Sequence, residues 1–235
     1  MTQTIMQLET LQKELAENGY LHIQSSPDDW MNFIQKVTQC KIMPQDEGEL
    51  IYDVKSTPGY ERLSNGKSQN ALRPHTEASY RDIPPQYIVL RCLQPSSCGG
   101  GYTAFVDGYD FLDNLSPEVK IRLSNEHHRF MSNQGQLETF APVLKFSPSN
   151  LPMLRFNYNA LYYGEHSPDV SKMSNQQEPF LPNFCQEVFN FFETQQTSIR
   201  LQKEEMLILD NYRMLHLRTS FSDPNRHLQN IWMGS

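Results

Sequence analysis

Hydrophobic side chains recur every three or four residues in two stretches near the start of the chain. The first stretch is residues 5–18, which ends at Asn18-Gly19, and the second follows the capping sequence Ser-Pro-Asp-Asp at residues 26–29. The hydrophobic positions are Leu8, Leu11 and Leu15, then Trp30, Phe33 and Val37. This period predicts two amphipathic helices. Neither carries a cluster of reactive side chains, so we expect both to be scaffold.

Short apolar runs bounded by turn residues predict strands over much of the remaining chain. We expect strands at residues 20–23, 50–54, 86–93, from 103, 142–146, 153–158, 206–210 and 226–232, and helices at 107–115, 117–125 and 177–195. The run at 86–93 is mostly apolar, which is typical of a strand buried on both faces. No repeat or interior linker interrupts the pattern, so we expect one domain over residues 1–235.

One long segment, residues 55–73, is polar and follows neither period. A long irregular segment inside a compact domain is usually functional or mobile. Because this segment leads directly to His75, we expect it to form a loop over a site. Arg62, Ser64 and Asn70 are candidates for contact with a polar substrate, although an ordinary solvated loop would have the same composition.

The sequence His75-Thr76-Glu77 is the first candidate for chemistry. In an extended segment, side chains two residues apart lie on the same face, so an imidazole and a carboxylate would point to one side. An open Fe(II) site commonly uses two histidines and one carboxylate. Most His-x-Glu triplets are ordinary surface or turn residues, so the assignment depends on a second histidine elsewhere in the chain.

Other clusters of ligand-forming residues carry less weight. His127 and His128 are adjacent, and neighbouring residues of a strand face opposite sides, so we do not expect them to bind one ion. The four cysteines match no zinc or Cys-x-x-Cys motif, and we expect reduced thiols. They are Cys40, Cys92, Cys98 and Cys185.

The charge of the chain limits its partners. The 235 residues carry a net charge of -7 and the pI is near 5.5, which argues against a nucleic-acid-binding surface. The sequence has no run of like charge, no long apolar segment and no leader-like N-terminus. We therefore expect no membrane partner and a cytoplasmic location. The oligomeric state stays open.

Several motifs occur in a fixed order along the chain. They are His75-x-Glu77, Gly100-Gly-Tyr-Thr103 with Asp107, Asp210-Asn-x4-His216-x-Arg218, Phe221 and Arg226-x-Leu228. This ordered set resembles the TauD/TfdA family of Fe(II)- and 2-oxoglutarate-dependent dioxygenases, and most closely its clavaminate synthase-like branch. The resemblance extends over residues 5–232. It implies a mainly β fold with flanking helices around a double-stranded β-helix, or jelly-roll, core.

The resemblance also implies roles for individual residues. His75, Glu77 and His216 match the iron ligands of the family. Arg226 matches the arginine that binds the distal carboxylate of 2-oxoglutarate, and Thr103 matches the threonine that assists it. A guanidinium suits a carboxylate because it donates two parallel hydrogen bonds.

One position departs from the family. Many relatives carry a second arginine four residues after Arg226, where this chain has Asn230. One fixed cation is therefore missing at the carboxylate of the cosubstrate or of the substrate. Asn230 and Arg218 are further candidates for substrate binding.

The implied activity is hydroxylation or desaturation of a small polar metabolite, such as an amino acid or a derivative. Fe(II) would be the cofactor, 2-oxoglutarate and O2 the cosubstrates, and succinate and CO2 the by-products. Glu77 argues against halogenation, because halogenating relatives replace this carboxylate with a small residue. Two alternatives are an iron oxygenase with an altered cosubstrate pocket, suggested by Asn230, and a non-catalytic jelly-roll protein that binds or senses a ligand. Succinate release with O2 consumption separates these functions.

Overall fold

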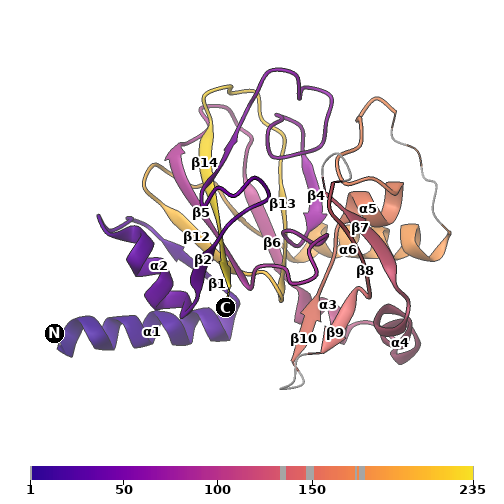
Figure 1. Cartoon of the computed structure of the whole chain (residues 1–235), viewed down its shortest axis with the longest axis horizontal. Coiled ribbons are helices and arrows are strands. Elements are labelled where there is room, and N and C mark those ends of the chain that lie inside the picture. Colours follow the sequence, from indigo (N-terminus) through magenta and orange to yellow (C-terminus); the bar gives the residue numbers. More distant parts are fainter. Residues whose placement is uncertain (1, 133–135, 147–150, 173, 175–177, 235) are drawn as a thin grey trace.

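Two antiparallel sheets form the centre of the computed structural model (Figure 1). The structure describes residues 2–132, 136–146, 151–172, 174 and 178–234. The large sheet consists of β1 (Tyr20–Ile23), β2 (Lys41–Met43), β3 (Tyr52–Lys55), β5 (Tyr87–Gln94), β12 (Met206–Asp210) and β14 (His227–Gly234). The small sheet consists of β4 (Leu72–His75), β6 (Thr103–Asp107), β11 (Thr197–Ile199) and β13 (Met214–Arg218). Two separate hairpins are β7 (His128–Met131) with β8 (Glu138–Ala141), and β9 (Leu144–Phe146) with β10 (Pro152–Leu154).

The order of the strands mixes distant parts of the chain. The large sheet runs β1-β12-β5-β14-β2, with β3 also paired to β14, and the small sheet runs β11-β6-β13-β4. All of these pairs are antiparallel. Strands from the two halves of the chain therefore alternate in both sheets, which is the arrangement of a double-stranded β-helix.

Helices cover the outer sides of the sheets (Figure 1). They are α1 (Thr2–Asn18), α2 (Trp30–Thr38), α3 (Gly108–Asp113), α4 (Pro117–Asn125), α5 (Tyr158–Tyr163) and α6 (Phe180–Gln195). On one face of the large sheet, Val89 and Ile208 pack with Leu15 and Val37 of α1 and α2. On the other face, Ile88 and its neighbours pack with the residues of the small sheet. The large sheet is thus apolar on both faces, as the run at 86–93 predicts.

Most of the elements predicted from periodicity are confirmed, with two corrections. Ser26 does not cap α2, because its hydroxyl donates to the carbonyl of Glu204 at 2.5 Å and Asp29 occupies the cap position. Residues 153–158 are not one strand: β10 ends at Leu154, and the side chain of Asn157 caps α5 by accepting from the amide of Ala160 at 3.0 Å. The predicted helix at 177–195 is α6, and residue 177 lies outside the described residues.

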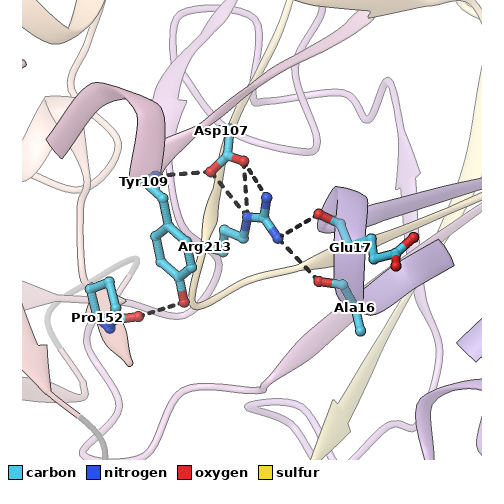
Figure 2. A network of polar contacts seen from close by, with 6 residues as sticks. All are labelled: Ala16, Glu17, Asp107, Tyr109, Pro152 and Arg213. Carbon is cyan, nitrogen blue, oxygen red and sulfur yellow. Dashed lines mark hydrogen bonds and ion pairs between the residues drawn. The ribbon is translucent and has the colours of Figure 1, made fainter. Parts of the chain in front are cut away.

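An ion pair ties the end of the small sheet to α1 (Figure 2). The guanidinium of Arg213 donates to both oxygens of Asp107, at 3.1 and 3.0 Å from Nε, and to the carbonyls of Ala16 and Glu17 at 3.2 and 3.0 Å. Asp107 also accepts from the amide of Tyr109 at 2.9 Å. These contacts fix the connection before β13, so the aspartate of the glycine-rich motif has a structural role.

Two further expectations concern the cysteines and the membrane. All four cysteines are free thiols, as predicted. Among the helices within the described ranges, none is both long enough and apolar enough to cross a lipid bilayer.

Candidate active site

Adjacent strands of the small sheet bring His75 and His216 together. The two residues are register partners on β4 and β13, and their ring centroids are 4.1 Å apart. Glu77 follows β4, and its Oε2 lies 3.8 Å from Nε2 of His216. One ligand atom from each of the three residues lies within 4.8 Å of the others, and no other such group of three is found among the described residues.

Both histidines have the neutral form that can bind a metal. His75 donates a hydrogen bond from Nδ1 to the carbonyl of Arg73 at 2.8 Å, because a carbonyl can only accept, and this leaves the lone pair of Nε2 free for an ion. Burial lowers the pKa of His75 to about 4 and the pKa of His216 well below its ordinary value. Both imidazoles are therefore neutral near pH 7, as metal ligands must be.

The backbone around Glu77 is fixed by distant residues. Its amide donates to Oδ1 of Asn211 at 2.6 Å, and Nδ2 of Asn211 returns a hydrogen bond to its carbonyl at 3.1 Å. On the other side, the amide of Thr76 donates to the carbonyl of Phe156 at 2.7 Å. Asn211 belongs to the Asp-Asn motif of the sequence, but nothing in the sequence indicated that its side chain clamps the segment that carries the carboxylate.

The carboxylate of Glu77 receives one hydrogen bond, from Nδ2 of Asn230 at 3.2 Å. Burial raises the pKa of Glu77 to about 7. A divalent cation would favour the ionised carboxylate, since it supplies the opposite charge that a buried anion requires. Two neutral imidazoles and one carboxylate converging on one point are the donor set of an open Fe(II) site, so the residues fit this ion.

Two arginines lie buried beside this group. Arg226 is 2% exposed and Arg218 is 4% exposed. Neither forms an ion pair with a described acidic side chain, and three of their nitrogens have no hydrogen-bond acceptor in the described part of the chain. Burial lowers the pKa of Arg226 to about 10, and burial together with the charge of Arg226 lowers the pKa of Arg218 to about 9. Both remain cations at neutral pH, so this region favours an anion.

The glycine-rich sequence allows the chain to pass close to Arg226. Gly101 has a φ of +80°, and a Cβ atom there would lie 2.9 Å from Nε of Arg226. A Cβ atom at Gly100 would lie 2.0 Å from the carbonyl oxygen of Ser220. Both positions therefore require glycine. Thr103, the first residue of β6, is the register partner of Arg218 and is 4% exposed.

A single cavity of about 870 Å³ includes the metal-binding group and both arginines. Thr103, Ser64 and Asn230 also line it. Arg62 and Asn70 do not: Arg62 is exposed, and Nδ2 of Asn70 donates to the carbonyls of Glu61 and Leu63 at 2.8 and 2.9 Å. Neither side chain therefore lies on the cavity wall where the substrate is expected, and Asn70 stabilises the loop itself.

Several residues on the cavity wall were not anticipated. They include Gln45, Tyr52, Lys67, Arg73, Tyr80 and His166. Gln45 binds the carbonyl of Asn230 through Nε2 at 2.8 Å, and the ring of Tyr80 contacts that of His166 edge to face at 5.5 Å. These residues come from separate strands and loops, so no local spacing in the sequence could have grouped them.

A jelly roll that brings two histidines and a carboxylate together beside buried cations has the architecture of a non-haem iron oxygenase. The model of the family "Taurine catabolism dioxygenase TauD, TfdA family" matches residues 7–232. The chain therefore belongs to the TauD/TfdA family of Fe(II)- and 2-oxoglutarate-dependent dioxygenases, as its motifs predict.

Individual relatives are distant. Clavaminate synthase 2 of Streptomyces clavuligerus is 22% identical over 184 residues, which are 74% of this chain and 52% of that protein. Mitochondrial trimethyllysine dioxygenase of Bos taurus is 27% identical over 71% of this chain and 41% of its own length. The chain thus spans about half or less of these curated relatives.

Solved structures share the fold. Asparagine oxygenase in complex with Fe(II), 3-hydroxyasparagine and succinate superimposes with a TM-score of 0.73, at 19% identity, over 99% of this chain and 79% of that one. The non-heme iron oxygenase OrfP with Fe and alpha-ketoglutaric acid superimposes with a TM-score of 0.66, at 16% identity, over 96% of this chain and 78% of that one. The double-stranded β-helix expected from the sequence is confirmed.

Proposed function

We propose that this chain is an Fe(II)- and 2-oxoglutarate-dependent hydroxylase of a small polar metabolite, an amino acid or a derivative of one. The observation that carries the proposal is the convergence of His75, Glu77 and His216 within 4.8 Å in a cavity that also contains two buried guanidiniums. In the balanced reaction, one oxygen atom of O2 enters a C–H bond of the substrate. The other enters 2-oxoglutarate, which becomes succinate and CO2.

Each of these side chains would have a defined task in this reaction. His75, Glu77 and His216 would hold the iron and leave the remaining coordination positions open. When bound, Fe(II) supplies the activation of O2 that no amino-acid side chain can provide. Arg226 would bind the distal carboxylate of 2-oxoglutarate through its planar fork, with the hydroxyl of Thr103 beside it.

The substrate class rests on the cavity and on the relatives. Charged side chains of both signs line the wall, among them Lys67, Arg73 and Glu49, together with the aromatic ring of Tyr52. Such a wall suits a small molecule that carries both charges, as amino acids do. Proteins of similar fold are described with hydroxylated asparagine and hydroxylated arginine bound, which supports the same class.

The position of Asn230 bears on the altered-pocket alternative. Its side chain is bonded to Glu77 and so belongs to the metal-binding side of the cavity. Asn230 in place of the second arginine would then change the contacts of the substrate, and Arg226 would remain available for 2-oxoglutarate. This favours an ordinary cosubstrate pocket with altered substrate contacts.

The test is succinate formation by the Fe(II)-loaded protein over a panel of amino acids and derivatives, with O2 consumption measured in parallel. Ala at His75, Glu77 or His216 should abolish turnover and iron binding while the circular dichroism spectrum stays unchanged. A matched control is His127→Ala, which removes an exposed imidazole and should retain both properties. Substantial activity in two of the three ligand variants would refute the assignment. Tight binding of a panel member without succinate would favour the non-catalytic alternative.

A further inference from the structure

The loop at residues 64–70 is ordered without a hydrophobic core of its own. Its sequence is Ser-Asn-Gly-Lys-Ser-Gln-Asn, which contains no apolar side chain. Even so, Ser64, Asn65 and Ser68 are only 3%, 5% and 1% exposed. Burial of polar groups is unfavourable unless they are hydrogen-bonded, so the conformation of this loop depends on its polar contacts.

Arg218 donates charge-assisted hydrogen bonds to the backbone of this loop. Its Nη2 donates to the carbonyl oxygens of Asn65 at 3.4 Å and Ser68 at 2.8 Å, and also to that of Asn70. Hydrogen bonds to a cation are stronger than those between neutral groups. The other backbone hydrogen bonds of the loop are neutral, such as the amide of Phe221 donating to the carbonyl of Gln69 at 3.0 Å. The loop's own cation, Lys67, lies over the ring of Tyr60 at 5.3 Å and contacts no carbonyl of residues 64–70. Three backbone carbonyls of the loop therefore converge on one guanidinium.

A second cation lies close to this guanidinium. The central carbon atoms of Arg218 and Arg226 are 4.9 and 5.0 Å from the centre of the same ring, that of Phe221, so the two charges are at most about 10 Å apart. Two like charges at this distance repel with an energy equivalent to on the order of tenfold in an equilibrium constant, at the effective dielectric constant of a protein site. An anion bound at Arg226 would cancel this repulsion.

We propose that Arg218 is a positioning residue that couples the binding of 2-oxoglutarate at Arg226 to closure of the loop at residues 64–70. This inference rests on the proposed function, because it takes 2-oxoglutarate as the anion. The charge that Arg218 adds near the anion favours cosubstrate binding, and the bound anion in turn favours the buried position of Arg218 that holds the loop. Coupling of this kind is reciprocal, so both effects have the same size.

The experiment is hydrogen–deuterium exchange of peptides that cover residues 60–73, on the Fe(II)-loaded protein without O2, with and without saturating 2-oxoglutarate. In the wild type, 2-oxoglutarate should slow exchange in this loop by about tenfold. Arg218→Gln keeps a donor but removes the charge, so it should bind 2-oxoglutarate about tenfold more weakly and show no ligand-dependent protection. Arg218→Lys keeps the charge and three donors, and should restore a large part of both effects. Arg62→Gln changes an exposed arginine outside the cavity and serves as the matched control.

The outcomes separate this inference from the proposed function. If the wild type does not bind 2-oxoglutarate, the proposed function fails with it. If the wild type binds 2-oxoglutarate but its loop exchanges at the same rate in both states, only the coupling is wrong. A purely structural role is indicated if the Gln variant exchanges faster in both states yet retains wild-type affinity and protection by the ligand, and this result would also overturn the proposal.

Discussion

Replacing Arg226 by Met should make the ligand-free protein more stable and greatly weaken its binding of 2-oxoglutarate. The side chain is 2% exposed and has no acidic partner among the described residues, so no opposite charge compensates its own, and the ring of Phe221 lies 5.0 Å from its central carbon. Replacing buried charged groups with apolar residues of similar volume is often stabilising by about 1–4 kcal/mol. Taking the lower limit of 1 kcal/mol, we expect the melting temperature of Arg226→Met to rise by about 2–4 °C for a chain of this size.

The opposite change is expected when the cosubstrate is present. Loss of one partner of a partly buried charge-assisted pair costs about 2–5 kcal/mol, which corresponds to at least thirtyfold weaker binding of 2-oxoglutarate. For the wild type, 2-oxoglutarate at 100 times its dissociation constant should add about 2.7 kcal/mol to the free energy of unfolding, or about 5–10 °C to the melting temperature. At the same concentration, Arg226→Met should show a far smaller increase.

Thermal denaturation of the metal-loaded protein, with and without 2-oxoglutarate, measures both effects in one assay. Arg129→Met is a suitable control, because Arg129 is exposed and does not line the cavity, so the change should leave the response to 2-oxoglutarate intact. If Arg226→Met keeps the wild-type increase in melting temperature, the arginine has been misassigned. If the ligand-free variant is instead strongly destabilised, other groups of the protein compensate the buried charge and the predicted gain in stability is wrong.

Three further predictions concern neighbouring residues. Thr103→Ala should weaken 2-oxoglutarate binding by about 1 kcal/mol, as loss of one hydroxyl hydrogen bond does, with iron affinity unchanged in a metal titration. Asn230→Leu removes the hydrogen bond to Glu77 and should weaken iron binding by about tenfold, measured by competition with a chelator; unchanged affinity would mean that this contact does not orient the carboxylate. Arg213→Met leaves Asp107 without its partner and should lower the free energy of unfolding by about 2–4 kcal/mol in a urea titration, while succinate formation per folded molecule is retained.

The sequence predicts the long helices and strands and part of the candidate site, for physical reasons. Long helices and strands, such as α6 and β5, carry enough side chains for their period to be recognised. The three-residue strands β2 and β11 do not, because their pairing with β14 and β6 decides their conformation. Alternation along one segment was sufficient to place His75 and Glu77 on the same side.

The contacts that hold the site together could not be derived in this way. Asn211 binds the backbone of Glu77 across 134 positions of sequence, and Arg218 binds the loop carbonyls across about 150. Both residues stand within motifs, but a motif records only that a residue type recurs at a spacing. Whether Arg218 faces a substrate or a loop depends on how β13 and residues 64–70 pack, which no local pattern encodes.

The distribution of unsatisfied polar atoms connects the stability of the fold with its function. Nine buried side-chain nitrogen and oxygen atoms in the described part of the chain have no hydrogen-bond partner, and eight of them belong to residues that line the cavity. The exception is Nε2 of His128. An unsatisfied buried polar group costs about 1–3 kcal/mol, so a fold selected for stability alone would not gather so many in one place. The set includes donors, such as Arg226, and acceptors, such as the side-chain oxygen of Asn230. One ion therefore cannot satisfy all of them. We expect the proposed ligands, a metal ion, a dicarboxylate and an amino-acid-like substrate, to satisfy part of this set between them, because together they carry negative, positive and neutral polar groups.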